Sequence, residues 1–192
     1  MKLRVLVVDE DPERLAMVNA ALTAAGYEIA GEVRTSAELP EQVRRTAPDV
    51  IVIDRDSPDR DTLEHICMVT RDGARPIVLF TADDDRATIR AAVQAGISAY
   101  VVDGLSPERI RPVIEVAVAR FDEHQALRRE LDQAKTTLAE RKTIERAKGI
   151  LMRKRGVSEE EAYRLLRSAA MERGERLATV AERVIAAADL FS

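Results

Sequence analysis

Carboxylates follow three of the apolar, β-branched segments of this 192-residue chain, at or just beyond the residue where each segment ends. Asp9 and Glu10 follow the first segment, Asp54 and Asp56 lie at and after the third, and Asp103 follows the fifth. Carboxylate oxygens are the ligands that hard divalent cations prefer, so a cluster of them can form a cation site. The question is which fold would bring these acids together.

Short β-branched runs alternate with amphipathic helical patterns over the first 120 residues, and this alternation predicts a parallel sheet covered by helices on both faces. The expected strands are residues 3–8, 27–33, 49–54, 76–80 and 98–102. The expected helices are residues 12–25, 36–46, 60–71 and 84–95. In such sheets the ligand site lies beyond the carboxyl ends of the strands, where the strand order switches. The strand-end acids are therefore expected to meet there.

Composition excludes several classes of protein. Aromatic residues make up 3% of the chain and Trp is absent, which argues against a sheet that reads nucleic acid by stacking bases on exposed rings. The single cysteine, Cys67, allows no internal disulfide and no cysteine metal cluster, as expected in a reducing compartment. No apolar run is long enough to span a bilayer and no signal peptide is evident, so we expect a cytoplasmic protein without a membrane partner.

The charge is distributed unevenly along the chain. Residues 1–140 contain 18 Lys and Arg against 26 Asp and Glu, a net charge of −8, whereas residues 141–192 contain 12 against 8, a net charge of +4. The densest basic segment is residues 141–155, RKTIERAKGILMRKR, in which seven cations face the single acid Glu145. An acidic body with a basic tail indicates a polyanionic partner for the tail.

Several short motifs within the first 120 residues occur in the order found in the receiver domains of two-component response regulators, which this region resembles. The resemblance implies an α/β fold of the flavodoxin-like, CheY-like type with a five-stranded parallel sheet, here residues 1–120. The matching residues are the acidic pair Asp9 and Glu10, the phosphoacceptor Asp54, Pro58 and Asp61 beyond it, the switch hydroxyl Thr81 and the switch aromatic Tyr100. Thr62 departs from the family, because a glycine is usual at this position.

The receiver resemblance also implies a Mg²⁺ site. Its ligands would be Glu10, Asp54 and the backbone carbonyl of Asp56, with Asp9 acting through water. The cation would neutralise charge as the carboxylate of Asp54 attacks an incoming phosphoryl group, and Thr81 would donate a hydrogen bond to the product. Weak Mg²⁺ binding is the cofactor prediction.

Asp103 departs from the family pattern, which places a lysine here to pair with the phosphoryl oxygens. Two unit charges ~4 Å apart interact by about 4 kcal/mol at an effective dielectric near 20, and exchanging attraction for repulsion roughly doubles the difference. Phosphorylation of Asp54 is therefore expected to be disfavoured as the main switch. The alternative is that Asp103 caps the turn into the next helix together with Ser106 and Pro107.

A long helical pattern continues past the end of the receiver region. Its apolar or small positions are Ile110, Ile114, Ala117 and Phe121, followed by Leu127, Leu131, Ala134 and Leu138. The spacing alternates between three and four residues, with a slip near His124, and predicts a coiled-coil linker over residues 110–140 that pairs with a second copy. The alternative is a monomeric helix folded back on its own tail.

The last 50 residues read as three short helices, an all-α bundle. Gly156 separates the first two, Ser158 and Glu161 form a capping box at the start of the second, and Gly174 precedes the third. Residues 136–192 resemble the ANTAR domain, an RNA-binding output module, through ERAKGILM and the Ser158, Glu161 and LLR motifs that follow. The RNA-binding residues expected on this basis are Arg141, Lys142, Arg146, Lys148, Gly149, Arg153, Lys154 and Arg155.

Receiver, helical linker and ANTAR tail together resemble transcription antiterminators that bind paired hairpins in nascent leader RNA. The chain most resembles the NasT-type regulators of nitrate assimilation, at Asp103 and at residues 57–66, SPDRDTLEHI. This resemblance implies a NasS-like nitrate-sensing partner protein. The alternative partner is a cognate histidine kinase. The alternative function is a phosphorylation-controlled, DNA-binding response regulator, although the tail offers no clear recognition helix. An enzyme is not expected, since no nucleophile–base pair or phosphate-cradling glycine loop is present.

Overall fold

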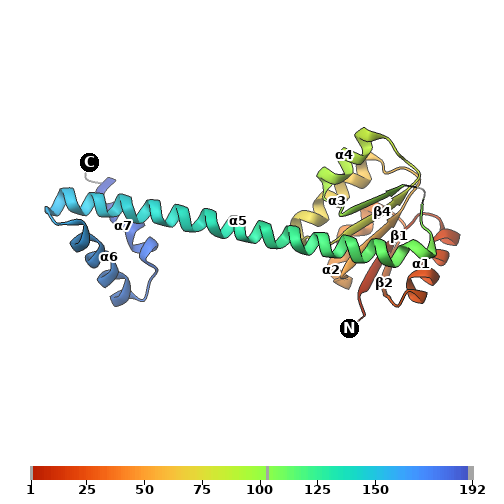
Figure 1. Ribbon diagram of the computed structural model, residues 1–192, viewed down its shortest axis with the longest axis horizontal. Coiled ribbons are helices and arrows are strands. Elements are labelled where there is room, and N and C mark those ends of the chain that lie inside the picture. Colours follow the sequence, from red (N-terminus) through yellow and green to blue (C-terminus); the bar gives the residue numbers. More distant parts are fainter. Residues whose placement is uncertain (1, 103, 190–192) are drawn as a thin grey trace. The chain divides into compact units, whose positions relative to one another are not determined.

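The computed structural model describes residues 2–102 and 104–189, apart from the side chains of residues 71 and 72, so Asp103 lies outside the described residues (Figure 1). The chain divides into two compact units, Met1–Gln125 and Ala126–Ser192. The first unit holds strands β1 (Arg4–Val8), β2 (Glu28–Val33), β3 (Val50–Asp54), β4 (Ile77–Thr81) and β5 (Ala99–Val102). Its helices are α1 (Pro12–Ala24), the 3-10 turn η1 (Ser36–Glu38), α2 (Leu39–Thr46), α3 (Arg60–Gly73), α4 (Arg86–Ala95) and the first part of α5 (Pro107–Arg155).

All five strands form one parallel sheet in the order β2-β1-β3-β4-β5, which confirms the predicted flavodoxin-like receiver fold. The chain moves from β1 outward to β2 on one side and to β3 on the other. The strand order therefore switches between β1 and β3. A crevice at the carboxyl ends of these two strands is where an open parallel sheet of this order binds its ligand.

The three central strands, β1, β3 and β4, are buried on both faces, as their near-continuous Val, Ile and Leu runs require. Alternate residues of each strand point to opposite faces and feed two separate cores. One core joins Val5, Val52 and Phe80 to α1 and to Ile110 and Ile114 of α5. The other packs α2, α3 and α4 against Leu6, Val8, Ile51, Ile53, Ile77 and Leu79.

Local signals set the ends of the receiver helices. Asp11 caps α1 by accepting hydrogen bonds from the backbone amides of Glu13 and Arg14, with Pro12 in the first turn. Gly96 ends α4 with φ of 104°, and a Cβ built there would lie 2.8 Å from Cγ2 of Thr70. Glycine is therefore required at this position both by the backbone conformation and by the contact with α3.

Helix α5 is continuous for 49 residues, so the first of the three short helices expected in the tail is the end of this long helix. No glycine or proline between Pro112 and Gly149 interrupts it. Ile110, Ile114 and Ala117 are fully buried against the sheet, whereas no described residue from 118 to 146 is buried. The slip near His124 thus marks where α5 leaves the receiver core. Across the described part of the chain, no helix combines the length and apolar character needed to cross a membrane.

The second unit packs the end of α5 against α6 (Glu159–Arg173) and α7 (Leu177–Asp189). Ser158 caps α6 as predicted, because its hydroxyl accepts a hydrogen bond from the Glu161 amide, while the Glu161 carboxylate pairs with Arg164. Gly174 ends α6 in the left-handed conformation, with φ of 62°. The core consists of Ala147, Leu166, Ala170, Val180 and Ala181, with Ile144 and Leu151 beside it. Small residues here let the helices approach closely.

Candidate functional sites

An acidic pocket lies at the carboxyl ends of β1 and β3, at the switch in strand order. Asp9 follows β1, Asp54 closes β3, and Asp56 lies two residues beyond it. The side chain of Asp9 is fully buried and that of Asp54 is 8% exposed, whereas that of Asp56 is 88% exposed. The structure therefore brings together three of the acids that the sequence analysis singled out.

One arginine holds this group of acids. Arg14, in the first turn of α1, donates from Nε to Oδ2 of Asp9 at 2.8 Å and from Nη2 to Oδ1 at 2.9 Å, a bidentate fork. Its Nη1 donates to Oδ1 of Asp56 at 3.1 Å, and its Nε lies 3.7 Å from Oδ2 of Asp54. The hydrogen bonds to Asp9 and the surrounding carboxylates raise the pKa of Arg14 further, so the guanidinium stays charged. Arg14 was not among the site residues predicted from the sequence.

Asp54 has the most perturbed carboxylate of the pocket. Burial is the main cause that raises its pKa to about 6; Arg14 opposes this shift, and the negative charges of Asp9 and Asp56 add to it. The 3.7 Å contact with Arg14 is too long for a hydrogen bond. A buried carboxylate with a raised pKa at a strand end is typical of a functional site.

Glu10 has a different partner from Asp9. It forms an ion pair with Arg55, whose guanidinium also donates a hydrogen bond to the hydroxyl of Thr62. Asp59, the N-cap of α3, lies 3.9 Å from the same guanidinium, and its hydrogen bonds with Thr62 lower its pKa. Thr62, which replaces the usual glycine, is thus part of the arrangement that holds Arg55.

Thr81 and Tyr100 lie beside the pocket on β4 and β5. The Thr81 hydroxyl donates a hydrogen bond of 2.8 Å to the backbone carbonyl of Asp56, the atom that the sequence analysis assigned to the metal. The amide of Ala82 donates to the same carbonyl at 3.2 Å. The Tyr100 hydroxyl donates to the carbonyl of Asp83 at 2.9 Å, and burial raises the pKa of Tyr100. The switch residues are thus tied to the loops that follow β3 and β4.

The second candidate site is a basic face at the end of α5. Lys142, Arg146, Gly149 and Arg153 follow each other at intervals of four, three and four residues and therefore share one side of the helix. The three cations are exposed, and a Cβ built on Gly149 would lie 3.5 Å from Nη1 of Arg153. The residues that pack on α6 and α7, which include Ala147, lie on the other side. Arg141, Lys154 and Arg155 are exposed as well.

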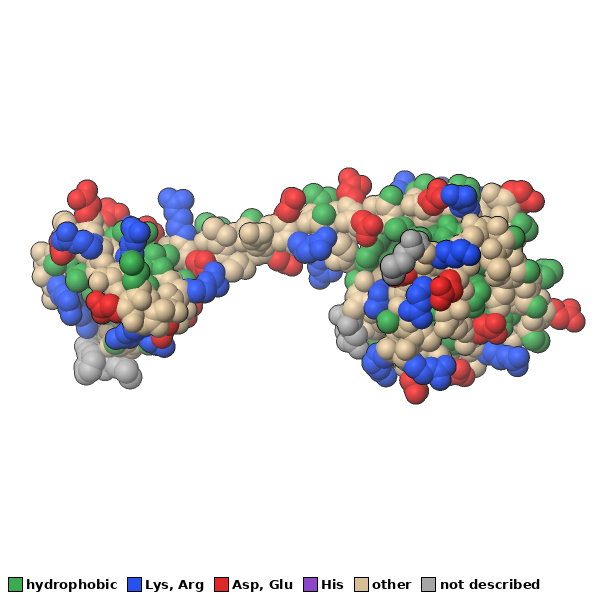
Figure 2. All heavy atoms as spheres, turned by 90° about the horizontal axis from the view of Figure 1, so that it is seen from below, with side chains coloured by type: hydrophobic (Ala, Val, Ile, Leu, Met, Phe, Trp, Pro, Cys, Tyr) green, Lys and Arg blue, Asp and Glu red, His purple; other side chains and the backbone are tan. Residues whose placement is uncertain are grey.

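A hollow adjoins this basic face, between α5 and α7. It is lined by Arg146, Ile150, Arg153, Lys154, Ala188 and Asp189. Ile150 is 8% exposed and provides an apolar floor beneath three cations. Arg146 lies 3.4 Å from both carboxylate oxygens of Asp189, and both side chains are largely exposed. Figure 2 shows blue Lys and Arg side chains over this unit, with red acidic side chains among them.

Lys148 differs from the other predicted RNA contacts because it is buried, with 7% of its surface exposed. Its ammonium donates to both oxygens of Glu145, at 2.8 and 2.9 Å, and to Glu159 at 2.7 Å. These hydrogen bonds raise the pKa of Lys148 and lower that of Glu159. Lys148 therefore contributes to the packing of this unit, since it links the end of α5 to the start of α6.

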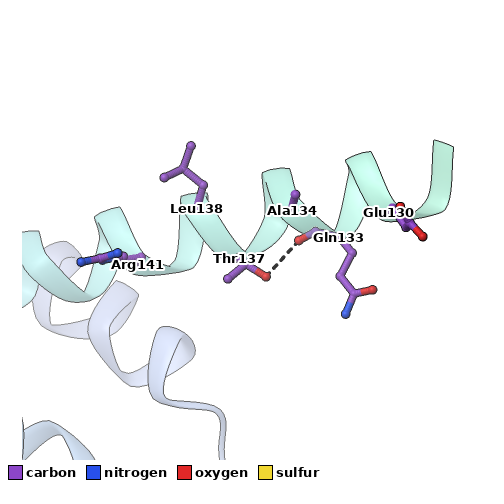
Figure 3. A pocket seen from close by; sticks show the side chains of 6 residues that line it. All are labelled: Glu130, Gln133, Ala134, Thr137, Leu138 and Arg141. Carbon is purple, nitrogen blue, oxygen red and sulfur yellow. Dashed lines mark hydrogen bonds between the residues drawn. The ribbon is translucent and has the colours of Figure 1, made fainter. Parts of the chain in front are cut away.

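The third candidate surface is the apolar stripe of α5 beyond the receiver. Leu127, Leu131 and Leu138 are 59%, 54% and 55% exposed. Leu138 and Ala134 also border a shallow hollow on one side of α5, lined in addition by Glu130, Gln133, Thr137 and Arg141 (Figure 3). The Thr137 hydroxyl is turned back to the carbonyl of Gln133. Large apolar side chains exposed at this spacing are typical of a helix that meets a partner.

Comparisons with known proteins match both units. Residues 5–115 match the response regulator receiver domain family, and residues 132–185 match the ANTAR domain family. The chain is 35% identical over 182 residues to the transcriptional regulatory protein PdtaR of Mycobacterium tuberculosis strain H37Rv, covering 95% of this chain and 89% of PdtaR. The chain belongs to the receiver–ANTAR response regulators. This family consists of regulators rather than enzymes.

Other relatives of this response regulator match the receiver alone. The chemotaxis protein CheY of Thermotoga maritima is 29% identical over 108 residues, covering 56% of this chain and 90% of CheY. Among solved structures, a LuxR-family response regulator from Aurantimonas sp. SI85-9A1 has a TM-score of 0.56 at 27% identity, over 62% of this chain and 86% of its own. The receiver domain of the putative response regulator NarL from M. tuberculosis has a TM-score of 0.54 at 26% identity, covering 60% of this chain and 96% of the NarL chain.

Receiver domains typically bind Mg²⁺ at the phosphorylation site, and the carboxylates of Asp9, Glu10, Asp54 and Asp56 are suitable donors for it. In the described arrangement of this response regulator, arginines occupy these carboxylates, so that no metal ion fits without displacing them. Within residues 2–102 and 104–189, no three Asp, Glu, His or Cys side chains converge so that they could hold one. Arg14 instead pairs with Asp9 and Asp56, and Arg55 pairs with Glu10.

Proposed function

We propose that this response regulator is a transcription antiterminator that binds paired hairpins in nascent leader RNA. The observation that carries the proposal is the basic face of α5, formed by Lys142, Arg146, Gly149 and Arg153, together with the ANTAR match. Exposed cations spaced along one side of a helix suit the phosphates of a nucleic acid backbone. Gly149 leaves the middle of this face without a side chain, so that a backbone can approach the helix closely.

The hollow beside the basic face supports recognition of an unpaired base. An A-form stem hides its major groove, so sequence is read mainly from loop bases that have left the stack. Ile150 offers such a base an apolar surface, and the guanidinium groups of Arg146 and Arg153 can stack on it or bind its phosphate. Asp189 can accept hydrogen bonds from a base edge once Arg146 turns towards phosphate.

A parallel pair of α5 helices would place two basic faces together. The exposed stripe of Leu127, Leu131, Ala134 and Leu138 has the alternating spacing of a coiled coil, and its leucines are more than half exposed in the single chain. A dimer that holds one hairpin on each basic face gains affinity through effective concentration, even where each single contact is weak. This is the physical reason to expect paired hairpins as the target.

Control by a partner protein forms part of the proposal. Asp103 places a negative charge where receivers usually have a lysine, and the resemblance of residues 57–66 to NasT-type regulators supports a role in nitrate assimilation. A NasS-like nitrate-sensing partner would then hold the regulator inactive, in preference to a histidine kinase that phosphorylates Asp54. Recovery of such a partner with the tagged protein only when nitrate is absent would support this step.

The RNA proposal is tested by gel-shift titration of the full chain. The ligands are a paired hairpin, one hairpin, a paired hairpin with scrambled loops, and duplex DNA of equal length, each at two salt concentrations. We expect the intact paired hairpin to bind most tightly. Affinity should fall steeply with salt, with a slope of about 0.7 to 0.9 in log–log form for each phosphate contact.

Matched variants locate the contact. The double variant Lys142→Ala, Arg153→Ala should bind RNA more weakly. The slope of log affinity against log salt should fall by the amount expected for the loss of roughly one to two phosphate contacts. Arg164→Ala is the control, because this α6 arginine pairs with Glu161 and lies outside residues 141–155. Equal affinity for all four ligands would reduce the basic face to a nonspecific polyanion surface and refute the antiterminator proposal. Preference for duplex DNA would instead favour a DNA-binding regulator.

A further inference from the structure

Two arginines of the chain itself partly neutralise the four acids of the acidic pocket in the receiver. Arg14 contacts Asp9, Asp54 and Asp56, which come from the ends of two neighbouring strands. Arg55 pairs with Glu10, the remaining acid of the pocket. Each acid that the receiver resemblance assigns to a metal therefore has a guanidinium within ion-pair distance.

The contacts of Asp9 leave little room for a further ligand. Its Oδ1 accepts hydrogen bonds from the Asp11 amide and from Nη2 of Arg14, both at 2.9 Å, while its Oδ2 accepts from Nε of Arg14 at 2.8 Å. The carboxylate is fully buried, so water cannot replace a lost partner easily. A planar guanidinium fork on a buried carboxylate is among the strongest charge-assisted pairs that side chains form.

The position of Arg14 in the chain explains how it reaches the pocket. Asp11 caps α1 immediately after β1, so the first turn of the helix lies beside the strand end that carries Asp9. Arg14 is the third residue of this turn, and its side chain is 27% exposed. An arginine is protonated at any physiological pH, so a change in pH does not remove its charge. Only a competing ligand can displace it.

We propose that Arg14 is the resident counter-ion of the acidic pocket and that it competes with divalent cations for the carboxylates of Asp9, Asp54 and Asp56. Arg55 supports this role by holding Glu10. The receiver is then folded and its acids are partly charge-compensated without a metal ion, and Mg²⁺ enters only when it displaces the fork of Arg14. Metal affinity is set by this arginine, independently of whether the tail binds RNA.

The test measures Mg²⁺ binding to the full chain by isothermal titration calorimetry, together with the melting temperature in EDTA and in excess Mg²⁺. Arg14→Met removes the guanidinium while keeping an unbranched side chain that suits a helix. We expect this variant to bind Mg²⁺ at least tenfold more tightly than the wild type, about 1.4 kcal/mol. It should also melt at a lower temperature in EDTA and recover when Mg²⁺ is added, whereas the wild type should change little.

Controls separate this effect from a general change of charge. Arg60→Met removes an arginine whose partner Glu64 lies outside the pocket, and it should bind Mg²⁺ as the wild type does. If Arg14→Met does not fold, Arg14→Lys keeps the charge but cannot form the fork, and its affinity should rise severalfold. Equal Mg²⁺ affinity of the wild type and the folded Arg14 variants would overturn the proposal. The proposal would also be overturned if Mg²⁺ raised the melting temperature of the wild type as much as it raises that of the Arg14 variants.

Discussion

Replacing Asp54 with Asn should make the receiver more stable near neutral pH. The carboxylate of Asp54 is 8% exposed, lies near two other acids, and, among the described residues, has its one ion contact with Arg14 at 3.7 Å. Asn has nearly the same size and shape but no charge. The substitution therefore removes an unfavourable buried charge without creating a cavity or breaking a hydrogen bond.

The size of the effect follows from the pKa of Asp54, which burial raises from 3.8 to about 6. Because the folded state binds this proton more tightly than the unfolded state, the carboxyl group disfavours folding increasingly above the unfolded-state pKa and fully above the folded-state pKa. A difference of about two pKa units corresponds to about 3 kcal/mol around pH 8. The gain from Asp54→Asn should shrink as pH falls, to roughly half of that near pH 5, where the wild-type carboxyl is largely protonated when folded.

Urea denaturation followed by far-ultraviolet circular dichroism in EDTA, at several values between pH 5 and pH 8, measures this difference. Asp84→Asn is the matched control, because Asp84 is exposed and lies outside the pocket, and it should show neither the gain nor its pH dependence. If Asp54→Asn lowered the free energy of unfolding, or raised it by the same amount at every pH, Asp54 would not carry an unfavourable buried charge.

Three further predictions concern other parts of the molecule. Asp103→Lys should raise the yield of phosphorylated Asp54 from small phosphodonors, as measured by intact mass; rapid stoichiometric labelling of the unmodified protein would contradict the reasoning. Leu127→Glu with Leu131→Glu should convert a dimer into a monomer in sedimentation velocity, and a wild type that is monomeric with and without RNA would count against pairing. Lys148→Ala should lower the melting temperature of the ANTAR unit by several degrees, because it leaves two carboxylates without their shared cation.

The strands and most helices could be predicted because their signals are local. Runs such as VIVI at residues 50–53 are β-branched and fully apolar, and Ser158 and Glu161 form a recognisable cap. The length of α5 was harder to predict, because its apolar residues pack against different elements at its two ends. Residues 110–117 face the sheet, while residues 144–151 face α6 and α7, so the pattern slips although the backbone hydrogen bonding continues.

The acids of the candidate site could be predicted from their places at strand ends, but their partners could not. Arg14 and Arg55 have long side chains, and which carboxylate each meets depends on the tertiary fold. A signal was present, since Arg14 lies five residues beyond Asp9 and Arg55 stands between two of the pocket acids. The burial of Lys148 depends on Glu159, which is placed by the turn at Gly156 and therefore follows from the packing of α6.

The unburied middle of α5 affects how such a protein can change in length. No described residue between 118 and 146 is buried, so residues can be added there without disturbing either core. Each added residue turns everything beyond it by about 100° around the helix axis. An insertion of seven or eleven residues nearly restores the original phase, whereas one of two or five does not. Evolution or engineering can therefore vary the length of this segment only in steps, while the proposed pairing stripe and basic face restrict its composition.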